Sequence, residues 1–315
     1  MDPVLPDYIV ELAATARRAF AELGGVDLAR QAEADPRARE LAGDALAALG
    51  ALDIDPLADA DQALAALALC REAGRVALPY PLEAMLCRHD GAVVVLVDPA
   101  DPLVDHADLL DPMLAVDLAG QVHHATVAGP ALGSRLGPFA VPVELQPHDG
   151  FADVDAPATI AWALSSATVL GYVEGAVDLC VEHVRTRHQF DQRLADFQAV
   201  QFQIADAVVA ASGLAELALF TVWRISELGA GARVDALALR LHAADVARTA
   251  MRTAQQLHGA SGVAEEYDVS VLCRRVQATL RSPVSSERNL DTLTAAIRQE
   301  GFASLFPHGR ERVST

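Results

Sequence analysis

The half of the chain that follows residue 157 constrains the fold most, because it consists almost entirely of apolar stretches with helical spacing. The first of these, Thr159–His188, is long enough for roughly eight helical turns,. Four further helical segments follow after short connections: Gln198–Leu228, Val234–His258, Asp268–Leu280 and Ser285–Glu300. Consecutive helices with short connections pack as antiparallel neighbours. The sequence therefore predicts a C-terminal antiparallel bundle of the four-helix type over residues 157–315.

The first 90 residues also favour helices, but shorter ones. Apolar residues recur at i, i+3, i+4 and i+7 in three segments, which are Tyr8–Leu23, Ala38–Leu49 and Asp61–Ala73,. Prolines separate these segments,. We expect an N-terminal helical domain over residues 1–90.

The pattern changes between residues 91 and 156. Ala92–Val97 is a short, mostly β-branched run that ends at Asp98-Pro99, and Gln121–Val127 and Phe139–Leu145 resemble it,. Roughly 60 residues with frequent Gly and Pro predict a small β domain,. The expected fold is therefore mainly α with a small β insert between two helical parts.

Composition and charge exclude several classes of function. The net charge is −19 and the pI is near 4.8, with no basic face of the kind that binds nucleic acid,. No secretory signal opens the chain, and no apolar run reaches the ~20 residues of a membrane span,. The four cysteines are scattered without a CxxC motif, and the histidines favour ordinary packing or surface roles,. These features predict a cytoplasmic protein with reduced thiols and no metal site.

Short motifs in the C-terminal half carry the functional signal. They follow one another as RHQFD (187–191), FQAVQ (197–201), AD (205–206), QLHGASG (256–262), EYDV (266–269) and an arginine at 274. Arg187 offers a rigid fork of donors that suits pyrophosphate, although for this residue taken alone a surface ion pair is the better explanation.

The amides and glycines of these motifs also admit two explanations each. Gln198 and Gln256 are amides in otherwise apolar stretches, where each needs a helix end or a ligand as partner,. Gly259 and Gly262 follow a helix, so they provide either a C-cap turn or a close approach of backbone N–H groups to a cofactor,.

In order and spacing these motifs resemble the acyl-CoA dehydrogenase family, which has R-x-Q-F-G, F-Q-x-x-Q, A-D, Q-x-x-G-G-x-G, E-Y-P-V and R-D. The resemblance covers residues 160–280 closely and most of the chain loosely, and it implies the family's helix–sheet–helix fold. It further implies that six positions bind the ADP half of an FAD that belongs to a neighbouring subunit: Arg187, Phe190, Gln198, Gln256, Gly259 and Ala260. Ala260 and Asp191 each replace a glycine of the family's pattern.

The family's catalytic base has no counterpart at its two usual positions. In the family a glutamate abstracts the α-proton of an acyl-CoA thioester while FAD accepts the β-hydride. Counting from the motifs places Pro283 and Ala161 at these positions, and neither residue can accept a proton. Glu266 and Glu287 are the only carboxylates that we expect near them.

The flavin-contacting part of the family's pattern is missing as well. Between residues 75 and 157 nothing matches the T-E-P-x-x-G-S-D stretch of the family's β domain, and Leu132-Gly133-Ser134 is a poor substitute. The β region is also shorter than the family's. The chain is therefore not expected to hold an isoalloxazine ring by itself.

The resemblance is strongest to the short, non-catalytic subunits of actinobacterial heterotetrameric acyl-CoA dehydrogenases that act on steroid side chains. It implies an α2β2 assembly with a larger catalytic subunit, which shares its FAD with this chain and holds most of the acyl-CoA. Two alternatives remain open: an active homo-oligomeric dehydrogenase with Glu287 or Glu266 as a displaced base, and a non-enzymatic scaffold with the same bundle.

Overall fold

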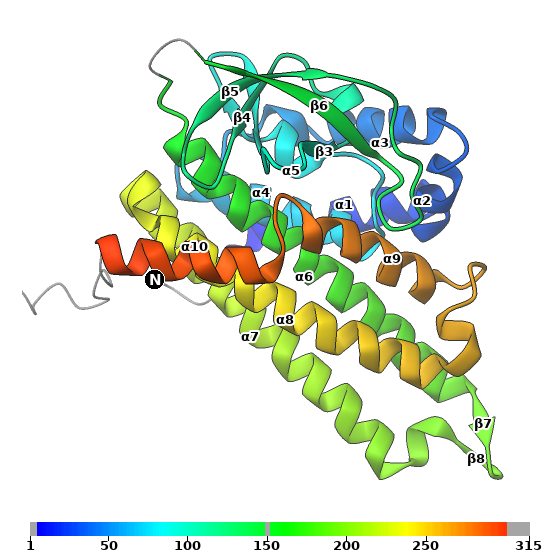
Figure 1. Ribbon diagram of the computed structural model, residues 1–315. Helices are drawn as coiled ribbons and strands as arrows, with labels where there is room; N and C mark the ends of the chain where they lie inside the picture. The colour runs from blue at the N-terminus through cyan, green and yellow to red at the C-terminus, as the bar shows by residue number, and fades with distance from the viewer. Residues whose placement is uncertain (1–4, 149–151, 301–315) are drawn as a thin grey trace, which may run out of the picture.

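The computed structural model describes residues 5–148 and 152–300 and consists of a helical bundle with a small sheet packed across one end (Figure 1). The N-terminal helices are α1 (Asp7–Glu22), α2 (Val26–Ala32), α3 (Arg37–Ala48), α4 (Ala60–Arg75) and the short α5 (Leu82–Met85). The C-terminal helices are α6 (Asp155–Thr186), α7 (Gln198–Leu228), α8 (Arg233–His258), α9 (Asp268–Arg281) and α10 (Ser286–Glu300). Helices α6 to α9 run back and forth in antiparallel succession (Figure 1).

The sheet has six strands in the order β1-β2-β4-β5-β6-β3, and β2 and β4 are parallel while the other neighbours are antiparallel. Its strands are β1 (Arg88–His89), β2 (Ala92–Leu96), β3 (Leu103–Asp105), β4 (Met113–Val116), β5 (Val122–Val127) and β6 (Ala140–Pro147). Val94 packs into the helical core, whereas Val93 and Val95 join a separate core on the opposite face. Since β2 is covered on both faces, its sequence is continuously apolar and does not alternate.

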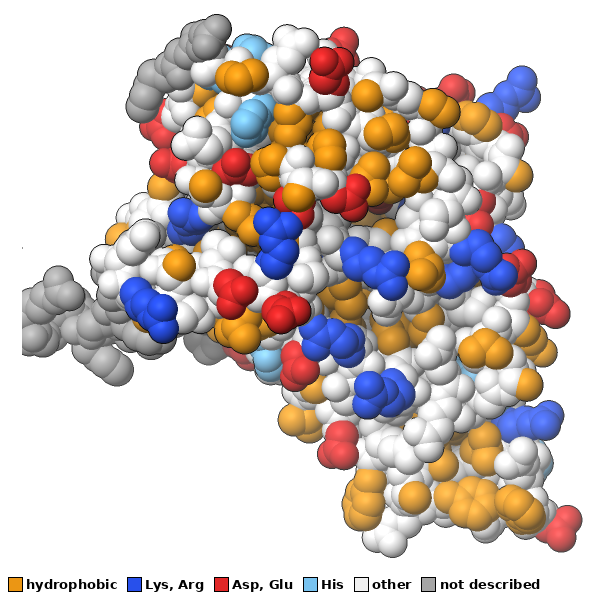
Figure 2. Space-filling view, in the orientation of Figure 1, with side chains coloured by type: hydrophobic (Ala, Val, Ile, Leu, Met, Phe, Trp, Pro, Cys, Tyr) orange, Lys and Arg blue, Asp and Glu red, His pale blue; other side chains and the backbone are white. Residues whose placement is uncertain are grey.

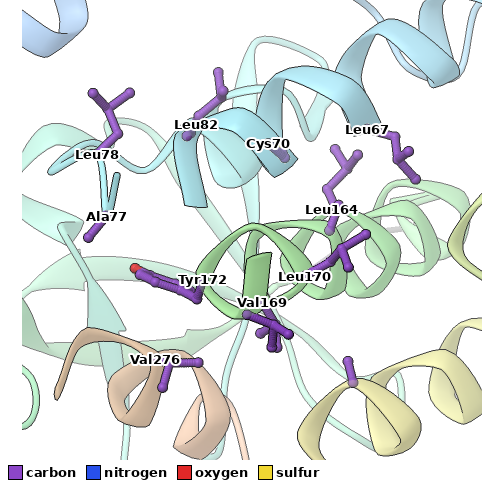
Figure 3. Packing of buried hydrophobic residues seen from close by; sticks show 14 of the residues in the cluster. Leu67, Cys70, Ala77, Leu78, Leu82, Leu164, Val169, Leu170, Tyr172 and Val276 are labelled. Atoms are coloured by element: carbon purple, nitrogen blue, oxygen red, sulfur yellow. The ribbon is translucent and has the colours of Figure 1, made fainter. Parts of the chain in front are cut away.

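Helix α6 lies at the centre of the molecule, between α4, α7, α8 and α9. Its apolar residues are buried nearly all round, as expected for a helix without a polar face,. Figure 3 shows Leu164 and Leu170 of α6 beside Leu67 of α4, and Tyr172 on the side of Ala77.

The crossing of α4 and α6 depends on glycine. A Cβ on Gly171 would lie 2.0 Å from the carbonyl oxygen of Arg71, and one on Gly74 would lie 2.1 Å from that of Thr168. The backbones therefore touch, and no larger residue fits without moving a helix. Next to this contact Arg75 Nη2 lies 2.9 Å from Glu174 Oε2, which holds the two helices in register.

Two segments are long and apolar enough to cross a membrane by length and composition alone, contrary to the expectation from sequence. They are Asp155–Thr186, whose apolar window is 83% buried within the fold, and Gln198–Gly262, whose window is 28% buried. The first segment is the central core helix. The second spans α7 and α8 and leaves much apolar surface uncovered.

The expected fold class is confirmed: the chain is mainly α-helical with a small β part. The predicted helix Gln198–Leu228 agrees with α7 at both ends, and the predicted Asp61–Ala73 helix is α4 with one residue more at its start and two at its end. The sequence did not reveal the short elements α2 and β4.

Candidate functional site

A cavity of about 110 Å³ lies between the sheet and helices α6 and α9. Ala161 in α6 and Pro283, which follows α9, both line it although they are 122 positions apart. The structure thus brings the two expected base positions to one place. The side chains there are a methyl group and a pyrrolidine ring, which have no proton-accepting atom.

Two carboxylates that sequence reasoning missed line the same cavity, namely Glu83 in α5 and Asp105 at the end of β3. Burial raises the pKa of Glu83 from 4.5 to about 7, and repulsion from Asp105 adds to the increase while Arg240 and Arg275 oppose it,. Burial also raises the pKa of Asp105. The sequence around Glu83, which follows a turn proline, and around Asp105, which ends a strand, contains no local signal that these two side chains line one cavity.

Glu266 and Glu287, by contrast, do not line the cavity. Glu266 is exposed in the loop before α9, and Glu287 is exposed in the first turn of α10. The expectation that these two are the only carboxylates near the base positions is therefore wrong, because the fold places Glu83 and Asp105 there instead.

Positive charge also reaches this cavity. Arg275 lines it from α9, at the position where the family's R-D motif has its aspartate. Its side chain is 3% exposed, and its Cζ lies 4.3 Å from the centroid of the Phe139 ring. His106, 2% exposed, lies on the same ring at 4.3 Å between centroids.

The size of the cleft allows a test of whether a flavin fits it. The inner cavity adjoins an outer one of about 250 Å³, and Asp105, Ala278, Ser282 and Pro283 line both. Sites for organic ligands of ordinary size take roughly 300–1,000 Å³. The inner cavity alone lies below this range, so it is too small for a flavin ring stacked on an acyl thioester,.

The second candidate region lies at the opposite end of the bundle. Arg187 is the exposed C-cap of α6, and a two-strand hairpin follows it: β7 (His188–Gln189) and β8 (Gln192–Arg193). The hairpin turn is Phe190-Asp191, with φ values of +53° and +63°. Positive φ at both central residues is the pattern of a type I′ turn, so the turn forms without the family's glycine.

Phe190 is the unusual residue of this turn. A bulky residue rarely adopts positive φ, and backbone strain of this kind gathers at functional sites. The ring is also 87% exposed and touches Phe197 edge-on, with 6.5 Å between centroids. Neither the backbone nor the packing of this chain explains an aromatic side chain here.

Gln198 and Gln256 differ from what their sequence context indicated. Gln198 is the first residue of α7 and Gln256 lies in the last turn of α8, and both are exposed. Their amides therefore need no partner within the chain. Both remain accessible to a ligand or to another subunit.

Gly259 caps α8 with φ +61°, and its N–H donates to the carbonyl of Gln256. Ala260 follows it, and both are exposed. The rings of His183 in α6 and His258 in α8 stack at 4.3 Å, which places the ends of these two helices side by side. The two halves of the motif set thus lie at one end of the bundle.

This end of the bundle is far from the cleft. Ala161 and Arg187 are 26 positions apart along one continuous helix, which at 1.5 Å per residue is roughly 39 Å. Figure 1 shows the same separation, with the sheet at the top and the β7–β8 hairpin at the bottom. A single flavin adenine dinucleotide is shorter than this separation. The exposed motif residues and the chain's own cleft therefore cannot serve the same cofactor molecule.

Within the described ranges, no group of three or more His, Cys, Asp and Glu side chains has an arrangement that could hold a metal ion. The four cysteines are buried and unbonded to one another.

Residues 148–289 match the family described as acyl-CoA dehydrogenase, C-terminal domain. Among curated proteins, the chain is 28% identical over 188 residues to acyl-CoA dehydrogenase FadE27 of Mycobacterium tuberculosis, a match that covers 57% of this chain and 46% of that protein. For the first curated relatives the aligned part spans between 27% and 46% of their length.

Solved structures match over nearly the whole chain. A chain of the ChsE4-ChsE5 complex from Mycobacterium tuberculosis superposes with a TM-score of 0.76 at 17% identity, covering 95% of this chain and 99% of that one. A chain of the Tcur3481-Tcur3483 steroid ACAD gives 0.76 at 19% identity, covering 93% and 98%. The C-terminal half of this chain is thus similar in sequence to the C-terminal domain of acyl-CoA dehydrogenases, and the chain shares the fold of these solved structures.

Proposed function

We propose that this chain is the smaller subunit of a heteromeric, FAD-dependent acyl-CoA dehydrogenase. In this proposal it lacks a catalytic glutamate of its own and completes the FAD site of a larger catalytic partner, in a cytoplasmic α2β2 assembly. The reaction is the α,β-desaturation of an acyl-CoA thioester. The observation that carries the proposal is the position of the six motif residues, which lie exposed at the bundle end roughly 39 Å from the chain's own cleft,.

The chemistry of the bundle end suits the anionic half of FAD. Arg187 carries a permanent charge on an exposed side chain, and no ion pair engages it within the described residues,. A guanidinium gives pyrophosphate short, charge-assisted hydrogen bonds. The exposed amides of Gln198 and Gln256 and the backbone at Gly259 would add neutral donors beside it.

The surface next to these residues supports a protein partner. Along α7 several large apolar side chains are exposed, with Val209 at 71% and Phe202 at 60%, and Phe190 of the hairpin adds another ring. Figure 2 shows hydrophobic side chains gathered at this lower end of the bundle. Large apolar side chains left exposed together on one face are typical of a contact with another molecule. A catalytic partner covering it would place its FAD against Arg187.

Our proposal for the acyl group of the substrate rests on similarity to other proteins alone. The chain resembles in fold a steroid ACAD and the ChsE4-ChsE5 complex, so a steroid side-chain CoA ester is the substrate class that we propose. The partner would hold most of this substrate, because the inner cavity of this chain is about 110 Å³.

One observation favours a second candidate, an active dehydrogenase with a displaced base. Glu83 lines the cleft together with Ala161 and Pro283, and its pKa is raised to about 7, which is the range of a tuned general base,. This candidate requires the cleft to open far enough to admit flavin and substrate.

The experiment that decides is co-expression with a neighbouring larger acyl-CoA dehydrogenase gene, followed by a flavin count per subunit. We expect the separately purified chain to show no stoichiometric flavin absorbance. In the complex, Arg187→Ala should raise the FAD dissociation constant by roughly tenfold or more, since each charge-assisted bond contributes about 1.5–3 kcal/mol. The complex should stay assembled.

Arg185→Ala is the matched control, because Arg185 is exposed in the last turn of the same helix but lies outside the motif. Unchanged FAD affinity in the Arg187→Ala complex would contradict the proposed shared site. A purified chain that is yellow and oxidises an acyl-CoA without a partner would instead establish the second candidate.

A further inference from the structure

We propose that the inner cavity of the cleft binds a short-chain carboxylate anion, with Arg275 as its anchor. This site is separate from the bundle end and goes beyond the proposed function. It would give the chain a ligand of its own, whether or not it completes a partner's FAD site.

The first step is the state of Arg275. The guanidinium is 3% exposed and lines the cavity, and its Nε and Nη1 have no hydrogen-bond partner among the described residues. Arg240, which is equally buried, donates from Nη2 to the carbonyl oxygens of Ser282, at 3.0 Å, and of Thr279. Arg275 lies instead over the face of Phe139, with its Cζ 4.3 Å from the ring centroid, which satisfies none of its N–H donors,.

The second step is the lack of a contacting counter-charge. Glu83 and Asp105 line the same cavity, but neither forms an ion pair with Arg275 within the described part of the chain. Burial favours the protonated form of both carboxyls. A guanidinium keeps its charge at every accessible pH, and a buried charge without a contacting partner is unfavourable. The two oxygens of a carboxylate match the fork of donors that Arg275 presents.

His106 is a second buried residue in this cavity that has a ring nitrogen without a hydrogen-bond partner. It is 2% exposed, adopts φ +55°, and its Nδ1 has no partner among the described residues. As a neutral imidazole it can donate one hydrogen bond to an anion without adding charge.

The size and walls of the cavity set the length of the ligand. A volume of about 110 Å³ corresponds to about four water molecules in the liquid,. Leu78, Val94, Val104 and Ala161 form apolar walls that suit a short alkyl chain and do not suit a sulfate or phosphate,. An anion of two to four carbons, such as acetate, propionate or butyrate, fits this description. The outer cavity, with Arg281 in its wall, gives such an anion a route inward.

Propionate is the probe for the first measurement, by ligand-observed NMR and by thermal unfolding of the full-length chain at constant ionic strength. We expect saturable binding and a higher midpoint of unfolding with propionate, but not with chloride. Propionamide has the same shape without the charge and should bind at least tenfold more weakly. Hexanoate, which exceeds the cavity, should bind more weakly than propionate.

Variants test the two halves of the proposal separately. Arg275→Met keeps the packing over Phe139 and removes the charge, so propionate should bind at least tenfold more weakly. Ala161→Leu fills the cavity and should abolish propionate binding. It tests the site independently of Arg275→Met, in case that variant does not fold. Arg18→Met is the control, because Arg18 is exposed in α1, away from the cleft.

Three results would overturn the proposal. The first is no saturable binding, which leaves solvent as the only occupant. The second is equal affinity for propionate and propionamide. The third is propionate binding that survives Ala161→Leu. None of these readouts uses FAD or a partner subunit, so failure here is distinguishable from failure of the proposed function.

Discussion

Glu83→Gln offers the most direct test of how the cleft is built. Its carboxyl sits in the cavity with a pKa raised from 4.5 to about 7, chiefly by burial. Below about pH 4.5 the group is protonated in both the folded and the unfolded chain, so it has no effect on the pH dependence of stability. As the pH rises toward 7, the unfolded chain loses the proton while the folded chain keeps it. The free energy of unfolding therefore falls over this window and stays constant above it.

The magnitude follows from the shift. A change from 4.5 to about 7 corresponds to a penalty of about 3 kcal/mol, which is an upper value because the side chain is only partly buried,. The part that accrues between about pH 5.5 and 7 is about 2 kcal/mol. Glutamine keeps the shape and cannot ionise, so Glu83→Gln should stabilise the chain by about 2 kcal/mol more at about pH 8 than at about pH 5.5.

Urea denaturation followed by circular dichroism at both pH values measures this difference, and the lower value stays above the pI near 4.8,. Glu287→Gln, in the exposed first turn of α10, is measured beside it to account for the loss of one negative charge from a chain of net charge −19. The reasoning is refuted if Glu83→Gln changes stability equally at the two pH values, or if its effect is larger at the acidic one.

Three further predictions concern packing, assembly and catalysis. Gly171→Ala should lower the free energy of unfolding in urea by about 3 kcal/mol or more, since the added methyl would lie 2.0 Å from a backbone oxygen of α4,. The control is Gly213→Ala in α7, whose methyl would meet nothing within 4 Å, so it should be neutral or slightly stabilising,. Phe190→Gly relieves a positive φ, so it should leave the thermal midpoint of the free chain unchanged or higher while weakening co-purification with the partner,. Glu266→Gln and Glu287→Gln should each leave turnover of the assembled complex within a few-fold, and abolished turnover with normal flavin content would contradict our assignment of the base to the partner.

The helices were predictable because their signals are local. Gln198–Leu228 ends where Gly229 adopts φ +54°, and the sequence carries both the periodicity and the breaker,. Helix α2 and strand β4 escaped notice because seven and four residues are too few to establish a period,.

The site was predictable only where motif spacing carried it. Counting along the chain brought Ala161 and Pro283 to one cavity, since each is tied to a nearby motif. Nothing local ties Glu83 to Asp105, and their shared cavity exists only after the sheet has packed against α6 and α9. The raised pKa of Glu83 results from that burial, so it could not be foreseen from the residues around it.

The two ends of α6 differ in what they contribute to the folded chain. Near its start Ala161 lines a small cavity, and the apolar walls there stabilise the fold whether or not a ligand binds,. At its far end Arg187 and Phe190 are exposed, and Phe190 adds backbone strain and an unburied ring. These features are unfavourable for the isolated chain, and covering by another surface offsets them: burial of one aromatic ring contributes about 1.5–3 kcal/mol. A subunit that completes a partner's site requires a surface that is unfavourable alone and favourable when covered. This is the physical reason to look for the function of this chain at the end of the bundle and not in its own cleft.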